Sequence, residues 1–235
     1  MFGRIAHRYD LMNTLMSLGM DAGWRRAAAD AAQSPRRGRV LDVGTGTGKL
    51  ALAVAESMQE GRVVGVDFAE PMLRTARVSL QSDLHGRRIM LSAADALRLP
   101  FPDEAFDAVV SAFVVRNLAD VAAGMAEQAR VLRTGGRLVV LEITPGPSSL
   151  IRPFFRMYFR GLVPLMGQLV AGDSQAYTYL PESAAVFLQP ESVAASLHAA
   201  GLVDITITRL GLGSVAITAA RKAQVKSANS GLTPA

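Results

Sequence analysis

The sequence of 235 residues contains no cysteine and only three histidines, which lie far apart at His7, His85 and His198. The absence of cysteine excludes disulfides, thiol nucleophiles and thiolate metal sites. Because the histidines do not have the spacing of metal ligands, the sequence also predicts no metal site. No run of about 20 apolar residues is present, so we expect no segment that spans a bilayer.

The first ten residues also lack a continuous apolar core, because Arg4, His7, Arg8 and Asp10 interrupt it. Such a start is not typical of a secretory signal, and we expect a cytoplasmic protein. The net charge is +5, but the basic residues stand mostly singly or in pairs, without the interleaved aromatic residues of a single-strand binder. We therefore expect no nucleic-acid partner and assign the charge to a solvated or membrane-facing surface.

The most informative stretch is residues 40–48, Val-Leu-Asp-Val-Gly-Thr-Gly-Thr-Gly. Its first four residues predict a buried strand, and the alternating glycines allow a sharp turn and a close approach of the backbone to a ligand. A helix is expected to begin at about Lys49. This arrangement is typical of a site for a nucleotide-like cofactor.

The spacing of the glycines narrows the choice of cofactor. A dinucleotide fingerprint, G-x-G-x-x-G counted from Gly44, would need glycine at Lys49, and the pattern here is G-x-G-x-G. A phosphate-binding Walker loop would need glycine at Val43 and Ser or Thr at Leu50. The sequence therefore does not favour phosphate binding or a nicotinamide oxidoreductase.

Two carboxylates accompany the glycine stretch. The predicted strand 63–67 ends in Asp67, where an acid can accept hydrogen bonds from both hydroxyls of a ribose. Asp42 lies in the first turn, where it could either order the loop or meet a cationic group of the ligand. Together these features suit a positively charged nucleoside, and they resemble the class I S-adenosylmethionine-dependent methyltransferases.

Strand and helix patterns alternate along the rest of the chain, which predicts an α/β fold with a mostly parallel sheet and helices on both faces. The resemblance implies a Rossmann-like sheet of seven strands whose last strand is antiparallel. Met72, Ala76, Leu80 and Leu84 are expected on one face of a helix that follows Pro71. Further strands are expected at 89–93, 106–113, 137–143, 202–208 and 215–219, with Gly135-Gly136 ending the helix before the fifth strand.

We expect three regions in the chain. Residues 1–34 would form an N-terminal helical cap, residues 35–222 a methyltransferase domain with a lid insertion at about 145–185, and residues 223–235 a disordered tail. In the insertion, Arg152, Arg156 and Arg160 stand at intervals of four residues among bulky apolar side chains. Such a segment can cover an apolar pocket or lie in a membrane interface, and the sequence leaves both roles open.

Several further stretches resemble the ubiquinone/menaquinone biosynthesis C-methyltransferase family, and the resemblance extends almost to Lys222. They are residues 8–13, 17–19, 24–26, 99–103, 116–117, 130–132, 135–136, 177 and 179–183, together with the cofactor loop and the closing hairpin. The chain departs from the family pattern at Ala112, where serine is common, and at Arg133-Thr134, where Lys-Pro is common. Ser111 should point to the opposite face of the strand from Ala112.

The resemblance implies that S-adenosylmethionine is the cofactor. Asp95 and Ala96, at the end of the third strand, are expected to read its adenine, and Met72 could either touch adenine or pack in the core. The full set of residues expected at the cofactor is Asp42, Gly44, Thr45, Gly46, Thr47, Asp67, Phe68, Met72, Asp95, Ala96 and Ala112.

The family also implies a prenylated quinol as substrate, methylated on a ring carbon, and hence peripheral contact with a membrane. The quinol hydroxyl must lose a proton, but no histidine or carboxylate is evident near that point. We expect Arg116 to stabilise the phenolate while Asn117 and Tyr9 orient it. The residues do not distinguish menaquinone from ubiquinone precursors, another small apolar acceptor or a non-catalytic cofactor-binding module, and the oligomeric state is open.

Overall fold

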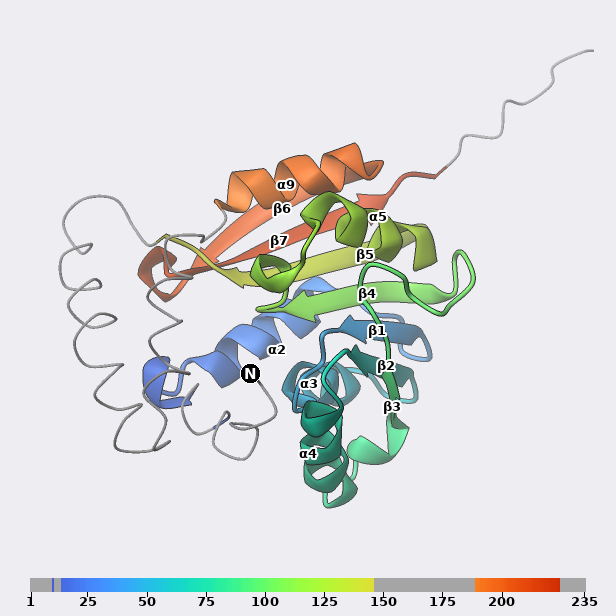
Figure 1. Cartoon of the computed structure of the whole chain (residues 1–235), viewed down its shortest axis with the longest axis vertical. Helices are drawn as coiled ribbons and strands as arrows, with labels where there is room; N and C mark the ends of the chain where they lie inside the picture. The colour runs from blue at the N-terminus through green and yellow to red at the C-terminus, as the bar shows by residue number, and fades with distance from the viewer. Residues whose placement is uncertain (1–9, 11–13, 146–188, 225–235) are drawn as a thin grey trace, which may run out of the picture.

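The computed structural model describes residue 10, residues 14–145 and residues 189–224 (Figure 1). Within these residues the chain forms a seven-stranded sheet with the strand order β3-β2-β1-β4-β5-β7-β6. The strands are β1 (Arg39–Val43), β2 (Arg62–Asp67), β3 (Ile89–Ala93), β4 (Phe106–Ala112), β5 (Leu132–Ile143), β6 (Leu202–Leu210) and β7 (Val215–Lys222). The first five pair in parallel, and β7 is antiparallel to both β5 and β6. The predicted fold class is confirmed.

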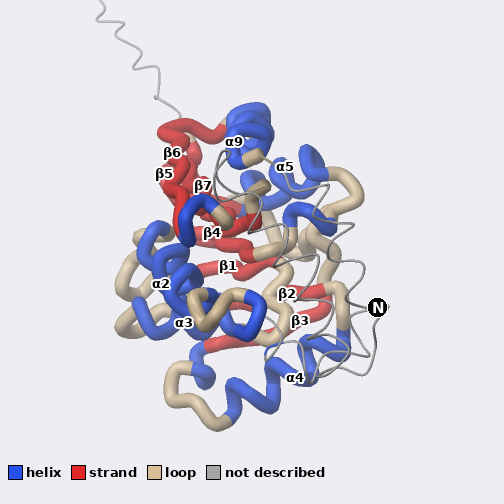
Figure 2. Tube along the Cα trace, turned by 90° about the vertical axis from the view of Figure 1, so that its left-hand side faces the viewer, coloured by secondary structure: helices blue, strands red, loops and turns tan. Residues whose placement is uncertain are grey.

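Helices cover both faces of the sheet (Figure 1; Figure 2). They are α2 (Asp21–Ala31), α3 (Lys49–Ser57), α4 (Glu70–Gln81), α5 (Val121–Val131) and α9 (Pro190–Ala199), with short 3-10 turns η1 (Gly86–Arg88), η2 (Val115–Asn117) and η5 (Gly211–Gly213). α3 begins at Lys49, as predicted. Among the helices that the structure describes, none has both the length and the apolar character needed to cross a bilayer.

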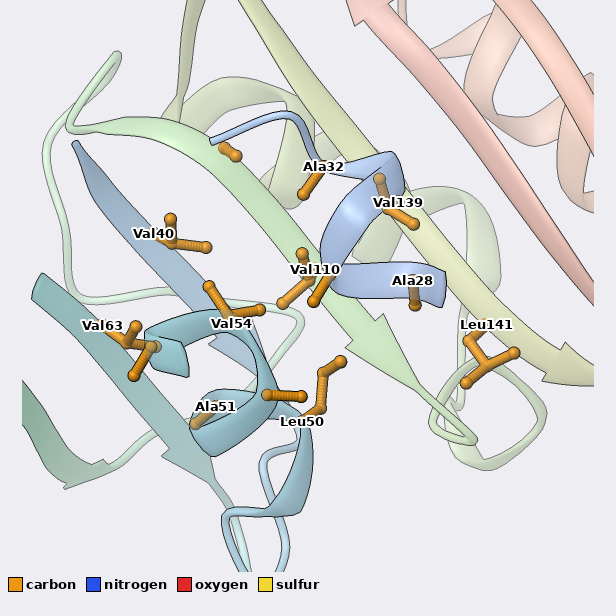
Figure 3. Close-up of a cluster of buried hydrophobic side chains, with 14 of the residues drawn as sticks. Ala28, Ala32, Val40, Leu50, Ala51, Val54, Val63, Val110, Val139 and Leu141 are labelled. Carbon is orange, nitrogen blue, oxygen red and sulfur yellow. The ribbon is translucent and has the colours of Figure 1, made fainter. Parts of the chain in front are cut away.

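Alternate residues of the central strands supply two separate cores. Val40 of β1 and Val110 of β4 pack with α2 and α3 on one face, where Ala28 and Val54 meet them (Figure 3). Leu41, next to Val40, instead belongs to the core under α5 and α9. Because both faces are buried, the central strands are continuous apolar runs, which is why they were predictable from the sequence.

The predicted end of the helix before β5 was wrong. α5 ends at Val131 and the chain enters β5 at Leu132, so Gly135 and Gly136 lie inside the strand. The register with β4 shifts between Phe106 and Ala108, and Gly135 takes a positive φ of 77° at this irregularity. The two glycines therefore accommodate a bulge in the sheet rather than a helix C-cap.

The predicted helical face that included Leu84 was also wrong at its last member. α4 ends at Gln81, and Leu84 is 81% exposed, whereas Met72, Ala76 and Leu80 are buried as predicted. The chain turns because Gly86 packs against the backbone of Leu80, where a Cβ would come within 2.0 Å of the carbonyl oxygen. This tight turn leaves no room for another helical turn.

Some of the expected features lie outside the described residues. These are Tyr9, the three arginines Arg152, Arg156 and Arg160, nearly all of the expected lid and most of the expected tail.

Candidate active site

A pocket with a volume of about 410 Å³ opens where the parallel strands end. Its wall comes from four successive strand ends. Nine of the residues predicted from the sequence lie in this wall. They are Gly44 and Gly46 in the loop after β1, Asp67 at the end of β2 with Phe68 and Met72 beyond it, Asp95 and Ala96 after β3, and Ala112 and Asn117 at the end of β4 and after it. In open α/β sheets ligands bind at this edge, so the pocket is the candidate site.

The loop after β1 approaches its neighbours closely and turns with left-handed backbone. Gly44 has φ 68°, and a Cβ there would lie 2.2 Å from a methyl carbon of Val114. Gly46 has φ 57°, but no atom lies within 4 Å of a Cβ built on it. Gly46 therefore presents bare backbone to open space on the pocket wall, which fits a closely approaching ligand.

Asp67 ties the tip of β2 to the two neighbouring loops. One carboxylate oxygen accepts the Gly46 N–H at 2.8 Å, and the other accepts the Ala69 N–H at 2.8 Å. Each oxygen keeps a second lone pair, so the fixed carboxylate can still accept two hydroxyl hydrogens from a ribose.

Asp42 does not line the pocket, and its side chain is fully buried beneath the loop. One oxygen accepts the Thr45 hydroxyl at 2.7 Å, and the other has no hydrogen-bond partner among the residues that the structure describes. Burial raises the pKa of Asp42 to about 7, against the lowering effect of the Thr45 hydrogen bond. Of the two roles that the sequence left open, the geometry favours ordering of the loop.

Thr45 and Thr47 also do not line the pocket. The Thr47 hydroxyl donates to Asp10 at 2.8 Å, and the Lys49 ammonium lies 3.5 Å from Asp10 and 3.9 Å from Asp21. These contacts join the N-terminal part of the chain to the cofactor loop.

At the end of β3, Asp95 accepts the Leu97 N–H at 2.9 Å and so shapes the turn.

Phe68, directly after β2, is 84% exposed although it is a large aromatic residue. An exposed ring on a pocket wall is suited to stacking on a flat ligand group. Met72 lines the pocket and is also buried, so it packs in the core and its contact with adenine stays a prediction.

The end of β4 contains a strained residue. Phe113 has φ 61° and donates its N–H to the carbonyl oxygen of Leu141 at 2.8 Å. Ala112 lines the pocket, whereas Ser111 is buried and does not. A positive φ in an aromatic residue is uncommon and is found where the surrounding structure fixes it, often at functional sites.

Arg116 lies in η2 and forms a buried ion pair that the sequence reading missed. Its guanidinium pairs with Glu142 of β5, and its N–H lies 3.4 Å from the other Glu142 oxygen. The side chains are only 11% and 5% exposed. Glu142 is a carboxylate beside Arg116, although it does not line the pocket, and the available signal for it was a glutamate inside the apolar stretch 138–143.

Two arginines lie over the ring of Phe113. The guanidinium carbon of Arg25 is 5.2 Å and that of Arg116 is 5.8 Å from the ring centroid. Arg116 is not on the pocket wall itself, while its neighbour Asn117 is, with its side-chain amide donating to the Phe113 carbonyl oxygen at 3.2 Å. The pocket thus ends at a strained aromatic residue that two cations support.

The fold is the one that S-adenosylmethionine-dependent methyltransferases share, with the pocket at the strand ends where such a fold binds its ligands. Among solved structures, a methyltransferase of this kind from Thermotoga maritima is 18% identical, with a TM-score of 0.65 covering 94% of this chain and 97% of the other. The Haemonchus contortus phosphoethanolamine N-methyltransferase 2, in complex with S-adenosylmethionine, has a TM-score of 0.63 at 18% identity, covering 88% of this chain and 57% of the other.

The sequence comparisons identify a particular family of methyltransferases. A model of the ubiE/COQ5 methyltransferase family matches residues 1–222, and the chain belongs to this family. It is 45% identical over 217 residues to a demethylmenaquinone methyltransferase of Roseiflexus castenholzii, covering 92% of this chain and 90% of the relative. A Deinococcus radiodurans protein of the same name is 49% identical, covering 86% and 83%. The family predicted from the sequence motifs is confirmed, as are the enzyme class and the cofactor.

Proposed function

We propose that this enzyme methylates a ring carbon of a prenylated quinol, with demethylmenaquinol as the acceptor. The observation that carries the proposal is the pocket at the strand ends, which the Gly44–Gly46 loop and Asp67 line, with the Arg116–Glu142 pair behind the wall residue Asn117. Relatives at 43–49% identity named demethylmenaquinone methyltransferase support this acceptor. The Desulfotalea psychrophila relative, 40% identical, is named for both ubiquinone and menaquinone biosynthesis, so a ubiquinol precursor is the second candidate.

The residues of the wall fit S-adenosylmethionine. Asp67 would accept the ribose hydroxyls, and Phe68, Met72 and the turn at Asp95 and Ala96 would enclose the adenine. The methionine end would then lie along Gly44 and Gly46 towards Ala112. When bound there, the cofactor supplies an electrophilic methyl group on a sulfonium.

The chain itself must make the ring carbon nucleophilic. Arg116 would stabilise the phenolate oxygen, because a guanidinium stays charged and is too basic to act readily as the proton acceptor. Glu142 would hold that guanidinium in place, and Asn117 on the pocket wall would orient the quinol or a relay water. By family resemblance Tyr9 would contribute to the same orientation.

A panel of acceptors tests the proposal. The enzyme is incubated with labelled S-adenosylmethionine and reduced demethylmenaquinone, a reduced demethyl ubiquinone precursor or a small apolar phenol, and the products are identified by mass spectrometry. We expect a ring-methylated menaquinol. Exclusive methylation of the small phenol, or binding of the cofactor without product from any acceptor, would overturn the proposal in favour of another methyltransferase or a binding module.

A single-turnover experiment tests the role of Arg116. At saturating cofactor and quinol, Arg116→Ala should slow methyl transfer by about 100-fold or more, because a preorganised donor to a developing oxyanion is lost. Arg116→Lys, which keeps the charge but not the planar guanidinium, should retain part of the rate. An unchanged rate in Arg116→Ala would refute the assignment.

We also propose that the protein is cytoplasmic and associates with the inner face of the membrane. The net charge of +5 and the arginines expected in the insertion at about 145–185 support this, since anionic lipids attract basic segments. Charge reversal of Arg152, Arg156 and Arg160 should reduce co-sedimentation with anionic vesicles. Reversal of the exposed pair Arg36 and Arg37, two residues against three, is the control, and equal loss in both variants would contradict the segment's role.

A further inference from the structure

One wall of the pocket belongs to the loop between β3 and β4. Ala94, Asp95, Ala96 and Leu97 line the pocket, and the chain then continues through residues 98–105 without regular helix or strand. The start of this wall is fixed, because the Ala94 N–H donates to the Asp67 carbonyl oxygen at 3.1 Å. Hydrogen bonds from the Leu97 and Arg98 N–H groups to Asp95 close the turn itself. The residues after the turn must also be attached to the rest of the fold if the wall is to keep one position.

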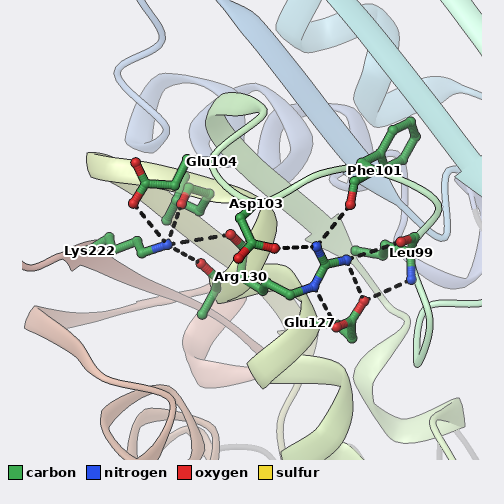
Figure 4. Close-up of polar contacts among 9 residues, drawn as sticks. Leu99, Phe101, Asp103, Glu104, Glu127, Arg130 and Lys222 are labelled. Atoms are coloured by element: carbon green, nitrogen blue, oxygen red, sulfur yellow. Dashed lines mark hydrogen bonds and ion pairs between the residues drawn. The ribbon is translucent and has the colours of Figure 1, made fainter.

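This attachment comes from two residues of α5, Glu127 and Arg130 (Figure 4). Glu127 accepts the Leu99 N–H at 2.9 Å, and Arg130 donates to the carbonyl oxygens of Leu99 at 3.1 Å and Phe101 at 2.9 Å. The two side chains also bind each other through both carboxylate oxygens, at 2.7 and 2.9 Å. The loop backbone is thus held by a bidentate ion pair only two residues beyond Leu97.

Of the two carboxylates that Arg130 contacts, Glu127 is much less exposed to solvent than Asp103. Arg130 also reaches Asp103 at 2.7 Å, but the Asp103 side chain is 76% exposed, whereas Glu127 is 21% exposed. The hydrogen bond from Arg130 holds the pKa of Glu127 below its ordinary value. Leu99 is itself buried, so its backbone groups depend on Glu127 and Arg130 for hydrogen bonds.

A neighbouring cation provides an internal comparison. Lys222 of β7 donates to the carbonyl oxygens of Ala129 at 3.0 Å and Leu132 at 2.7 Å, and lies 3.5 Å from Glu104 (Figure 4). It therefore stabilises the C-terminal end of α5 without touching residues 94–103. Arg130 and Lys222 lie close together, but Lys222 contacts the loop at Glu104, near its far end, whereas Arg130 contacts Leu99 and Phe101, nearer the pocket wall.

We propose that Arg130 and Glu127 are positioning residues that set the affinity for S-adenosylmethionine by holding the wall formed by Ala94–Leu97. The inference rests on the proposed placement of the cofactor in this pocket. Neither side chain lines the pocket, so they act through the Asp95 turn. Loss of the pair lets the loop sample other conformations. Binding of the cofactor must then order the loop again, and the free energy of this ordering weakens the binding. The residues at the methyl end of the cofactor are left in place.

The test compares Arg130→Met with Lys222→Met in the full-length enzyme. Calorimetry should show the dissociation constants of S-adenosylmethionine and S-adenosylhomocysteine rising about ten-fold in Arg130→Met. The maximal rate at saturating cofactor should stay within about two-fold of the original enzyme, and the KM for quinol should not change. Lys222→Met should lower the melting temperature without weakening cofactor binding.

A general effect on folding would lower the melting temperature of both variants and leave the dissociation constants alone, which would overturn the inference. A large loss of maximal rate in Arg130→Met would do the same. If Arg130→Met does not fold, Glu127→Gln, which retains one acceptor for the Leu99 N–H, should still weaken binding and spare the rate. Asp67→Asn tests the placement of the cofactor separately from the role of Arg130 and Glu127. Unchanged cofactor affinity in that variant would refute the placement itself.

Discussion

At the scale of single residues, Asp42 is a fully buried acid whose pKa burial raises to about 7. The ordinary pKa of an unfolded aspartate is about 3.9, so between these values the folded chain holds a proton that the unfolded chain has lost. The contribution of Asp42 to stability therefore falls as the pH rises from about 4 to about 7.

Asp42→Asn keeps a neutral side chain of the same shape and should remove this dependence. Relative to the original enzyme, the free energy of unfolding of the variant should rise by up to about 4 kcal/mol between pH 4 and pH 8. Denaturant titrations at several pH values measure it, with Asp30→Asn, at an exposed position of α2, as the control. Parallel pH profiles for Asp42→Asn and the original enzyme would contradict the prediction.

Gly44 and Gly46 share a left-handed backbone but differ in their surroundings. Gly44→Ala would force a methyl group against Val114, where the distance to a built Cβ is 2.2 Å, and should destabilise the fold by about 2–4 kcal/mol. Gly46→Ala meets open space and should cost only about 1 kcal/mol, yet its methyl group enters the pocket and should weaken cofactor binding.

Denaturant unfolding and cofactor titration of both variants distinguish the two effects. The double variant Gly44→Ala with Val114→Ala should recover part of the lost stability, because the clash is removed. Equal stability losses in the two single variants, with no rescue, would show that the contact with Val114 is not what requires glycine at position 44.

At the scale of elements, the strands and the cofactor loop could be predicted because their signals are local. The apolar run before Gly44 and the acid at the tip of β2 are each contained in a few residues, and both appear at the pocket edge as expected. The bulge at Gly135 and Gly136 and the turn at Gly86 could not be predicted. The bulge depends on the register with β4, where a Cβ on Gly136 would come within 2.7 Å of the Asp107 carbonyl oxygen, and the turn depends on the close packing of Gly86 against the backbone of Leu80.

The Arg116–Glu142 pair shows the same limit within the site. The two residues come from η2 and β5, and they meet because β5 lies beside β4 in the sheet. Strand order is not written in any short stretch of sequence, so the partner of Arg116 emerged only from the fold. A glutamate in a buried strand end is nonetheless a signal, because a charge is rarely buried without a partner.

Glu142 should matter for the rate more than for cofactor binding. Glu142→Gln keeps an acceptor but loses the ion pair, so Arg116 would be held less firmly and the turnover number should fall about ten-fold with little change in the KM for cofactor. Glu142→Ala should also destabilise the protein by about 3–5 kcal/mol, because it leaves a buried charge unpaired. Steady-state kinetics and denaturant unfolding measure the two effects, and an unchanged turnover number in Glu142→Gln would contradict the prediction.

At the scale of the whole molecule, the site is assembled from parts of the chain that are distant in sequence. The pocket takes its walls from four strand ends, and contacts from Asp10 and Asp21 to Lys49 add the N-terminal part of the chain. A ligand that binds there contacts several elements at once. Cofactor binding should therefore stabilise the molecule as a unit rather than one loop.

S-adenosylmethionine at 100 times its dissociation constant should stabilise the folded chain by about 2.7 kcal/mol, which for a protein of this size raises the melting temperature by about 5–10 °C. S-adenosylhomocysteine should act similarly, since it keeps the ribose and adenine that Asp67 and Phe68 are placed to receive. NAD is the control, because the third glycine, Gly48, comes one position earlier than a dinucleotide fingerprint requires. Thermal unfolding with each ligand measures the shift. An equal shift with NAD would contradict the assignment of the glycine loop to a sulfonium nucleoside, whereas a shift confined to the two adenosyl ligands, and lost in Asp67→Ala, would place the binding energy at the tip of β2.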